Sequence, residues 1–186
     1  MTVVVVDANV LYGIEITDVL LTLATRRLFR VHWSAEILDE VQRNLAKRAD
    51  LSTAAIAYRI EMMNRALPTA LAEAPAELIV SMPVNDKDRH VLALAVHLGA
   101  DAVISQNLRD FPTVACEPFG VEAISPDEFL ARQARLDPAA IIGAFGEMAR
   151  RRRRPPKTVG EIVDRLEPSL PTFVAFLRGM PGMREH

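Results

Sequence analysis

A run of four valines at the start of the chain, Val3 to Val6, is followed at once by Asp7 and then by Asn9. An unbroken β-branched run is typical of a strand buried on both faces, as in a parallel sheet covered by helices. In such sheets, ligands bind beyond the carboxyl ends of the strands. Asp7 therefore stands where a ligand is expected, although Asp and Asn also suit a turn or a helix cap.

Strand-like and helix-like segments alternate after this start. The expected strands are 28–33, 77–82, 101–105 and 121–124, and the expected main helices are 34–45, 52–67 and 85–98. Ser34 and Ser52 are good N-cap residues, and Gly99 fits the position just past a helix end. This alternation predicts an α/β fold with a mostly parallel sheet flanked by helices.

From Ser125 onward the pattern becomes helical and is punctuated by prolines. Ser125 followed by Pro126 is a typical helix start. We predict two parts, a sheet-containing domain over residues 1–130 and an all-helical C-terminal extension over residues 131–186.

Composition limits the class of protein. Half of the 186 residues are hydrophobic, which is enough for a substantial core, and the net charge is −2. That charge excludes a globally basic nucleic-acid binder, so contact with nucleic acid requires a local patch. The single cysteine, the lack of a signal peptide and the lack of a long apolar run predict a cytoplasmic protein without a membrane span.

Further acidic residues are expected at the edge that carries Asp7. If residues 77–82 form a strand, a right-handed crossover starts the next helix near this edge, which brings Asp88 there. Asp110 follows the strand 101–105 and is expected nearby, although a turn role is equally open. Glu40 flanks the apolar stripe of its helix and is the acid that can reach inward, or it is an ordinary exposed residue.

Three or four carboxylates at one sheet edge repel one another unless a cation joins them. No Lys or Arg is evidently placed among them, and hard oxygen ligands favour Mg²⁺ or Mn²⁺. Such an ion can activate water for attack on a phosphodiester. Zinc is not indicated, because His90 and His97 lie seven residues apart, have no Cys partner and fit a helix surface.

These motifs resemble the PIN-domain ribonucleases, in particular the branch related to the VapC toxins of toxin–antitoxin pairs. The resemblance covers residues 2–130 and rests on Asp7-x-Asn9, on Glu40 in WSAEILDEVQRNL, on Asp88 in NDKDRHVLALAVHLGADAVIS, and on the SQNLRDF loop. The C-terminal segment is similar to a helical extension found on a subset of such toxins. The resemblance implies a Mg²⁺- or Mn²⁺-dependent endoribonuclease that cuts tRNA or rRNA, binds a cognate antitoxin protein and forms a homodimer.

The resemblance also implies roles for individual residues. The metal-binding and catalytic positions are Asp7, Glu40, Asp88 and Asp110. The residues that orient water or a carboxylate, or contact a phosphate, are Asn9, Ser105, Asn107, Arg89 and Arg109. Many relatives carry an acid where this chain has Asn107, and this departure either weakens the second metal site or shifts that ligand role to Asp110.

Other interpretations stay open. Asn107 leaves room for a catalytically inactive PIN module that only binds RNA or a protein. A phosphoaspartyl enzyme with Asp7 as nucleophile is disfavoured, because no Asp-x-Asp-x-Thr motif follows the first strand. The basic run Arg150 to Arg154 with Lys157 suits contact with an RNA backbone, or else a solvated helix end.

Overall fold

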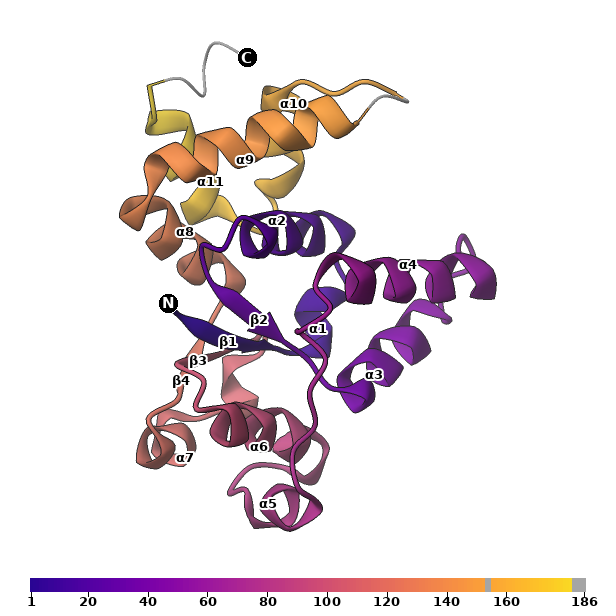
Figure 1. Ribbon diagram of the computed structural model, residues 1–186, viewed down its shortest axis with the longest axis vertical. Coiled ribbons are helices and arrows are strands. Elements are labelled where there is room, and N and C mark those ends of the chain that lie inside the picture. The colour runs from indigo at the N-terminus through magenta and orange to yellow at the C-terminus, as the bar shows by residue number, and fades with distance from the viewer. Residues whose placement is uncertain (153–154, 182–186) are drawn as a thin grey trace.

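The computed structural model describes residues 1–152 and 155–181. Its centre is a four-stranded sheet with the strand order β2-β1-β3-β4, and every neighbouring pair is parallel (Figure 1). The strands are β1 (Val3–Val6), β2 (Arg30–His32), β3 (Ala102–Ile104) and β4 (Glu122–Ile124). The predicted α/β fold with a parallel sheet is therefore confirmed, and the valine run forms a central strand.

Helices lie on both sides of this sheet, with α2 and the C-terminal helices on one side and α5 and α6 on the other (Figure 1). The helices of this part are α1 (Ala8–Leu11), α2 (Ile14–Thr25), α3 (Ala35–Leu45), α4 (Thr53–Ala66), α5 (Ala76–Ser81), α6 (Arg89–Leu98) and α7 (Thr113–Cys116). Three short 3₁₀ helices are η1 (Asp86–Asp88), η2 (Leu108–Asp110) and η3 (Glu117–Phe119).

The predicted helix caps are present. The side chains of Ser34 and Ser52 accept hydrogen bonds from the backbone N–H groups of Ile37 and Ala55, at the starts of α3 and α4. Gly99 follows α6 with a φ of +58°, in the left-handed region that favours glycine. Each signal is local, which is why the sequence alone was sufficient to predict it.

The predicted strand 77–82 is wrong, because these residues form the helix α5 (Ala76–Ser81), which packs against α6. The pair Ile79-Val80 favours a strand, but the preceding Ala-Glu-Leu are strong helix formers. A strand inside a parallel sheet needs cover on both faces. Val80 is instead 73% exposed, so this segment has no place in the sheet.

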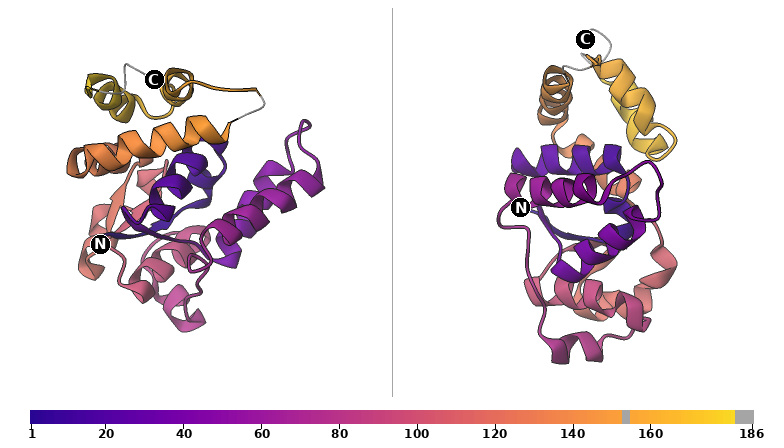
Figure 2. Two further views of the ribbon diagram at one scale, coloured as in Figure 1. Left: turned by 45° about the horizontal axis from the view of Figure 1, so that its top comes forward. Right: turned by 90° about the vertical axis from the view of Figure 1, so that its right-hand side faces the viewer.

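The C-terminal extension is helical, as predicted, and lies over α2 (Figure 2). Its helices are α8 (Pro126–Leu136), α9 (Pro138–Arg151), α10 (Val159–Leu166) and α11 (Pro171–Gly179). Residue 130 falls inside α8, so the division of the chain at that point stays a prediction. Arg153 and Arg154 of the basic run lie outside the described residues.

One hydrophobic core runs through both parts of the chain. The rings of Phe29, just before β2, and Phe129, on α8, meet edge to face with centroids 4.9 Å apart. Phe145 and Phe173 pack within the extension at 6.0 Å. The extension is thus anchored to the sheet by buried aromatic contact. Among the described residues, no helix is both long and apolar enough to cross a membrane.

Candidate metal centre

Asp7 ends the central strand, and its side chain is buried at the carboxyl edge of the sheet. Its backbone N–H donates to Ile104 O at 3.0 Å, which continues the pairing of β1 with β3. Asp7 precedes α1, yet its carboxylate makes no capping hydrogen bond to that helix. Asp7 is therefore not a side-chain cap of α1, and its carboxylate is available for other contacts.

A small polar network fixes this carboxylate. Asp7 Oδ2 accepts hydrogen bonds from Ser105 Oγ at 2.7 Å and from Asn9 Nδ2 at 2.6 Å. Asn9 Nδ2 also lies 3.0 Å from Ser105 Oγ, and Asn9 Oδ1 accepts from the Gln106 N–H at 3.0 Å. Ser105 is fully buried. Asn9 and Ser105 thus hold the Asp7 carboxylate by joining the ends of β1 and β3, and their role in orienting a metal ligand stays a prediction.

Asp88 lies at the same edge of the sheet as Asp7, but the element that was predicted to place it there is absent. The strand expected before it is a helix, but α6 leads directly into β3 and packs on β1 and β3. A helix that packs antiparallel to the strand after it begins at that strand's carboxyl end. Asp88 is 8% exposed, makes no capping bond, and its Oδ2 forms no hydrogen bond with any described residue.

Asp110 lies in the loop after β3 and completes the acidic group. Its Oδ2 accepts from Asn107 Nδ2 at 2.7 Å and from Lys87 Nζ at 3.1 Å. Lys87 Nζ also lies 3.6 Å from Asp88 Oδ2, which is an ion pair but too long for a hydrogen bond. Lys87 therefore stands between two of the predicted metal ligands, a feature that the sequence reasoning missed.

The electrostatics of the site disfavour charged carboxylates. Burial raises the pKa of Asp7, and the charge of Asp110 adds to this, while the hydrogen bond from Ser105 opposes it. Burial also raises the pKa of Asp88, again with a contribution from Asp110, which Lys87 partly offsets. Buried carboxylates that raise one another's pKa are stabilised by a bound cation.

These residues fit a hard divalent ion, because their donors are oxygens and one of them, Asp88 Oδ2, is buried without a hydrogen bond. The carboxylates do not, however, converge on one common position for a metal ion. Within residues 1–152 and 155–181, no three His, Cys, Asp or Glu side chains converge as a metal site does. The ammonium group of Lys87 pairs with both Asp88 and Asp110 and occupies the space between these two carboxylates.

Other predicted residues are less closely tied to the acids. Glu40 is half-buried on α3, and its role as a metal ligand stays a prediction. Arg89 donates to two backbone carbonyl groups, those of Met82 and Val84, and pairs with Asp86. It holds the loop before α6 and has little freedom to bind phosphate.

His90 is a neighbour of the site that the sequence reasoning placed wrongly. It is 5% exposed, not on a helix surface, and its Nδ1 makes no hydrogen bond with a described residue. Its Nδ1 lies 3.9 Å from Glu36 Oε2. A signal was present, because His90 shares its helix face with Ala93 and Leu94, three and four residues on.

Removing the competing ammonium group is expected to strengthen metal binding. Lys87→Met should bind Mn²⁺ about twofold to fivefold more tightly, the range expected for release of an exposed ion pair. Isothermal titration of the purified chain measures this directly. Lys47→Met is the matched control, because Lys47 is exposed just past the end of α3 and, among the described residues, its ammonium group bonds only to Asn44. An unchanged or weaker Mn²⁺ affinity for Lys87→Met would contradict this role of Lys87.

Comparison with known proteins agrees with this geometry. Residues 3–109 match the family model described as "PIN domain", and residues 126–179 match the model of the "VapC50 C-terminal domain". A relative described as "Putative ribonuclease VapC50", from Mycobacterium tuberculosis strain H37Rv, is 37% identical over 112 residues. That alignment covers 60% of this chain and 66% of the relative, just under two thirds of its length. No solved structure gives a significant match.

The parallel sheet, the acidic edge and a match over more than half of the chain define a PIN domain, and this chain belongs to that family. Within the family, it is similar to VapC50, whose C-terminal domain model matches the extension. The predicted resemblance to VapC-like PIN proteins with a helical C-terminal extension is therefore confirmed.

Proposed function

We propose that this chain is a Mg²⁺- or Mn²⁺-dependent endoribonuclease and the toxin of a toxin–antitoxin pair. The observation that carries the proposal is the pair of buried carboxylates, Asp7 and Asp88, whose pKa values are raised by burial at one sheet edge. Carboxylates whose pKa values are raised by burial are concentrated at functional sites. The relative described as a ribonuclease supports the choice of RNA as the substrate.

In the proposed mechanism, Asp7, Asp88 and Asp110 would hold the metal ion, with Glu40 as a further ligand. When bound, the ion would activate a water for attack on the phosphodiester and would offset negative charge at the phosphate. Ser105 and Asn9 keep Asp7 Oδ2 in one orientation through hydrogen bonds of 2.7 and 2.6 Å. Since outer hydrogen-bond partners tune metal ligands, these two side chains are positioning residues.

In this proposal, exposed residues at the rim of the site contact the RNA. Arg109 is exposed beside Asp110, and it makes no ion pair or hydrogen bond with the described residues, so its guanidinium group can bind a phosphate. Asn107 donates to Asp110 and so holds that carboxylate toward the site rather than serving as an acidic ligand. Cytoplasmic location, a tRNA or rRNA target, an antitoxin partner and a homodimer complete the proposal by family analogy.

A catalytically inactive module that binds RNA or protein is the second candidate. It is favoured by Asn107, which stands where many relatives have an acid, and by the Lys87 ammonium group beside Asp88 and Asp110. The two candidates differ in whether the chain binds Mn²⁺ and cuts RNA.

The test is incubation of the purified chain with a mixed tRNA and rRNA pool in Mg²⁺ or Mn²⁺. Discrete fragments with 5′-phosphate and 3′-hydroxyl ends are expected, and primer extension maps each cut. A folded chain, free of any bound inhibitor, that leaves the whole pool intact would contradict the proposal and favour the binding module.

A further inference from the structure

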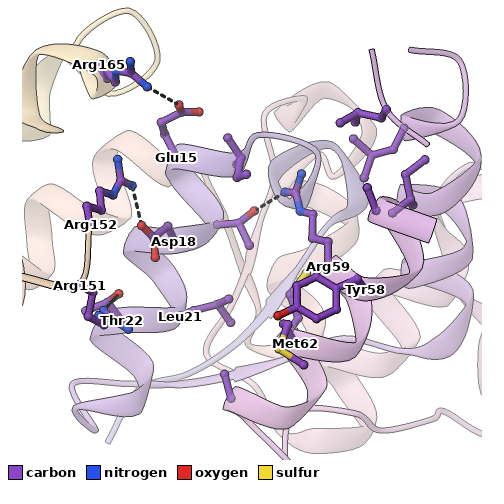
Figure 3. A pocket seen from close by; sticks show the side chains of 18 of the residues that line it. Glu15, Asp18, Leu21, Thr22, Tyr58, Arg59, Met62, Arg151, Arg152 and Arg165 are labelled. Carbon is purple, nitrogen blue, oxygen red and sulfur yellow. Dashed lines mark hydrogen bonds and ion pairs between the residues drawn. The ribbon is translucent and has the colours of Figure 1, made fainter. Parts of the chain in front are cut away.

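A groove of about 1090 Å³ lies between α2, α4 and the C-terminal extension, and we call it the α2–α4 groove (Figure 3). One wall comes from α2 and the other from α4, while the extension contributes side chains from α9, α10 and the segment between them. The described lining contains none of the four candidate metal ligands. The groove is therefore a second feature of the surface, separate from the acidic site.

The groove is positively charged in a chain whose net charge is −2. Among the described residues, six cationic and two acidic side chains line the groove. Asp50 and Glu147, just outside this lining, pair with Arg48 and Arg151, so six cations face four acids and the net charge is +2. The cationic residues are Arg48, Arg59, Arg151, Arg152, Lys157 and Arg165. A cleft lined by one sign of charge concentrates ligands of the opposite sign, so the expected ligand is an anion.

Ion pairs with α2 hold the arginines of the extension in place. Arg152 lies 2.6 Å from Asp18, and Arg165 lies 3.9 Å from Glu15 (Figure 3). Lys157 makes no ion pair with a described residue, and loss of solvent together with the charges of Arg165 and Arg152 lowers its pKa. Four of the six lining cations are thus ion-paired, and the remaining positive charge lies on Lys157 and Arg59.

The opposite wall offers an aromatic surface. Tyr58 on α4 is 63% exposed, and its ring lies beside Met62, facing the groove opposite Leu21 (Figure 3). An exposed aromatic ring next to a cationic wall is the arrangement on which single-stranded nucleic acids bind, with bases stacked and phosphates paired. The charge excess and the free aromatic ring together favour RNA over an apolar peptide.

The groove is adjacent to the acidic edge. Arg59, at the bottom of the α4 wall, donates from its guanidinium group to Leu11 O at 2.6 Å and to Tyr12 O at 3.3 Å. Leu11 is four residues beyond Asp7 on α1, which corresponds to roughly 6 Å along the helix axis. The groove therefore approaches the acidic edge to within about one turn of α1.

We propose that the α2–α4 groove binds the single-stranded RNA segment that flanks the scissile phosphate, and that the C-terminal extension supplies its cationic wall. This inference rests on the proposed ribonuclease function, because it gives that substrate a binding surface. It also gives the extension a role that a PIN domain without this segment lacks.

The test measures RNA binding in the absence of cleavage. Fluorescence anisotropy with a labelled single-stranded RNA of about 12 nucleotides, in excess chelator, reports binding to the full chain. Tyr58→Ala is expected to weaken binding by roughly fivefold or more, as loss of one stacked base does. Lys157→Gln is expected to flatten the slope of log affinity against log salt by about 0.7, as loss of one phosphate contact does.

Matched controls separate these effects from general ones. Phe119→Ala removes a 40% exposed aromatic ring, and Arg30→Gln removes an exposed cation, both outside the groove. Both controls should retain the wild-type affinity and salt slope. Wild-type affinity in the double variant Tyr58→Ala/Lys157→Gln would overturn the proposal. If that variant instead loses binding to an acidic amphipathic peptide alone, the groove belongs to a protein partner and the proposal is also overturned.

The two proposals fail in different ways. RNA binding that depends on the groove, without any metal-dependent cut, would contradict the proposed function and leave the groove assignment standing. Metal-dependent cleavage with RNA affinity unaffected by the groove variants would contradict only the groove assignment.

Discussion

Asp7→Asn is expected to lower metal-dependent RNA cleavage by more than about 100-fold, because loss of even an outer partner of a metal ligand typically costs 10–100-fold. Asn keeps an oxygen that can accept the hydrogen bonds from Ser105 and Asn9, so the fold should persist. Single-turnover cleavage of a mapped RNA site measures the effect. The matched control is Asp101→Asn at the opposite edge of the sheet, where Asp101 Oδ2 accepts from the Val3 N–H. Full activity in Asp7→Asn would show that Asp7 is not a metal ligand.

The same substitution should stabilise the metal-free chain. Because burial raises the pKa of Asp7, the folded chain binds this proton more tightly than the unfolded chain does. The resulting stability is present at low pH and is lost as the pH rises from the unfolded pKa through the folded pKa. At neutral pH, Asp7→Asn should therefore raise the melting temperature by a few degrees, since 1 kcal/mol corresponds to roughly 2–4 °C at this size. Added Mn²⁺ should stabilise only the wild type.

Phe129→Ala is expected to destabilise the whole chain by about 3–5 kcal/mol, as removal of a buried phenylalanine does. Phe129 is 3% exposed, and its ring packs edge to face on Phe29, which is 1% exposed next to β2. Because the rest of the hydrophobic core still runs through both parts of the chain, the variant should unfold in one transition. Urea denaturation followed by circular dichroism measures both the free energy and the number of transitions.

The control for this prediction is Phe119→Ala, which truncates a 40% exposed ring and should change the free energy of unfolding by no more than about 0.5 kcal/mol. A loss below about 1 kcal/mol for Phe129→Ala would show that the aromatic contact does not anchor the extension. Two separated transitions would instead support the predicted division of the chain into two independent parts.

The fold was predictable where the deciding signals are local. The valine run before Asp7, the caps at Ser34 and Ser52, and Gly99 after α6 each act within a few residues, and each appears in the structure. The strand prediction for residues 77–82 failed because the β-branched pair Ile79-Val80 also fits a helix with one face exposed to solvent. Whether a segment enters a sheet depends on cover from distant elements, and local propensity does not record this.

The residues of the site also fall into a group that local signals placed and a group that depends on distant contacts. Asp7, Asn9, Ser105, Asp88 and Asp110 were predictable, because parallel strands and the helix before β3 bring their ends to one edge. The Lys87 ammonium group and the buried His90 were missed, because each depends on side-chain direction across the site. The sequence also showed the basic run but not its partners on α2, since the pair Arg152–Asp18 spans 134 residues.

The most direct test of the central claim is RNA cleavage by chelator-stripped protein before and after Mn²⁺ is restored. We expect the stripped chain to leave the tRNA and rRNA pool intact, and restored Mn²⁺ to give discrete cuts with 5′-phosphate ends in the wild type but not in Asp7→Asn. Equal cutting by the wild type with and without the metal would contradict a metal centre at Asp7 and Asp88.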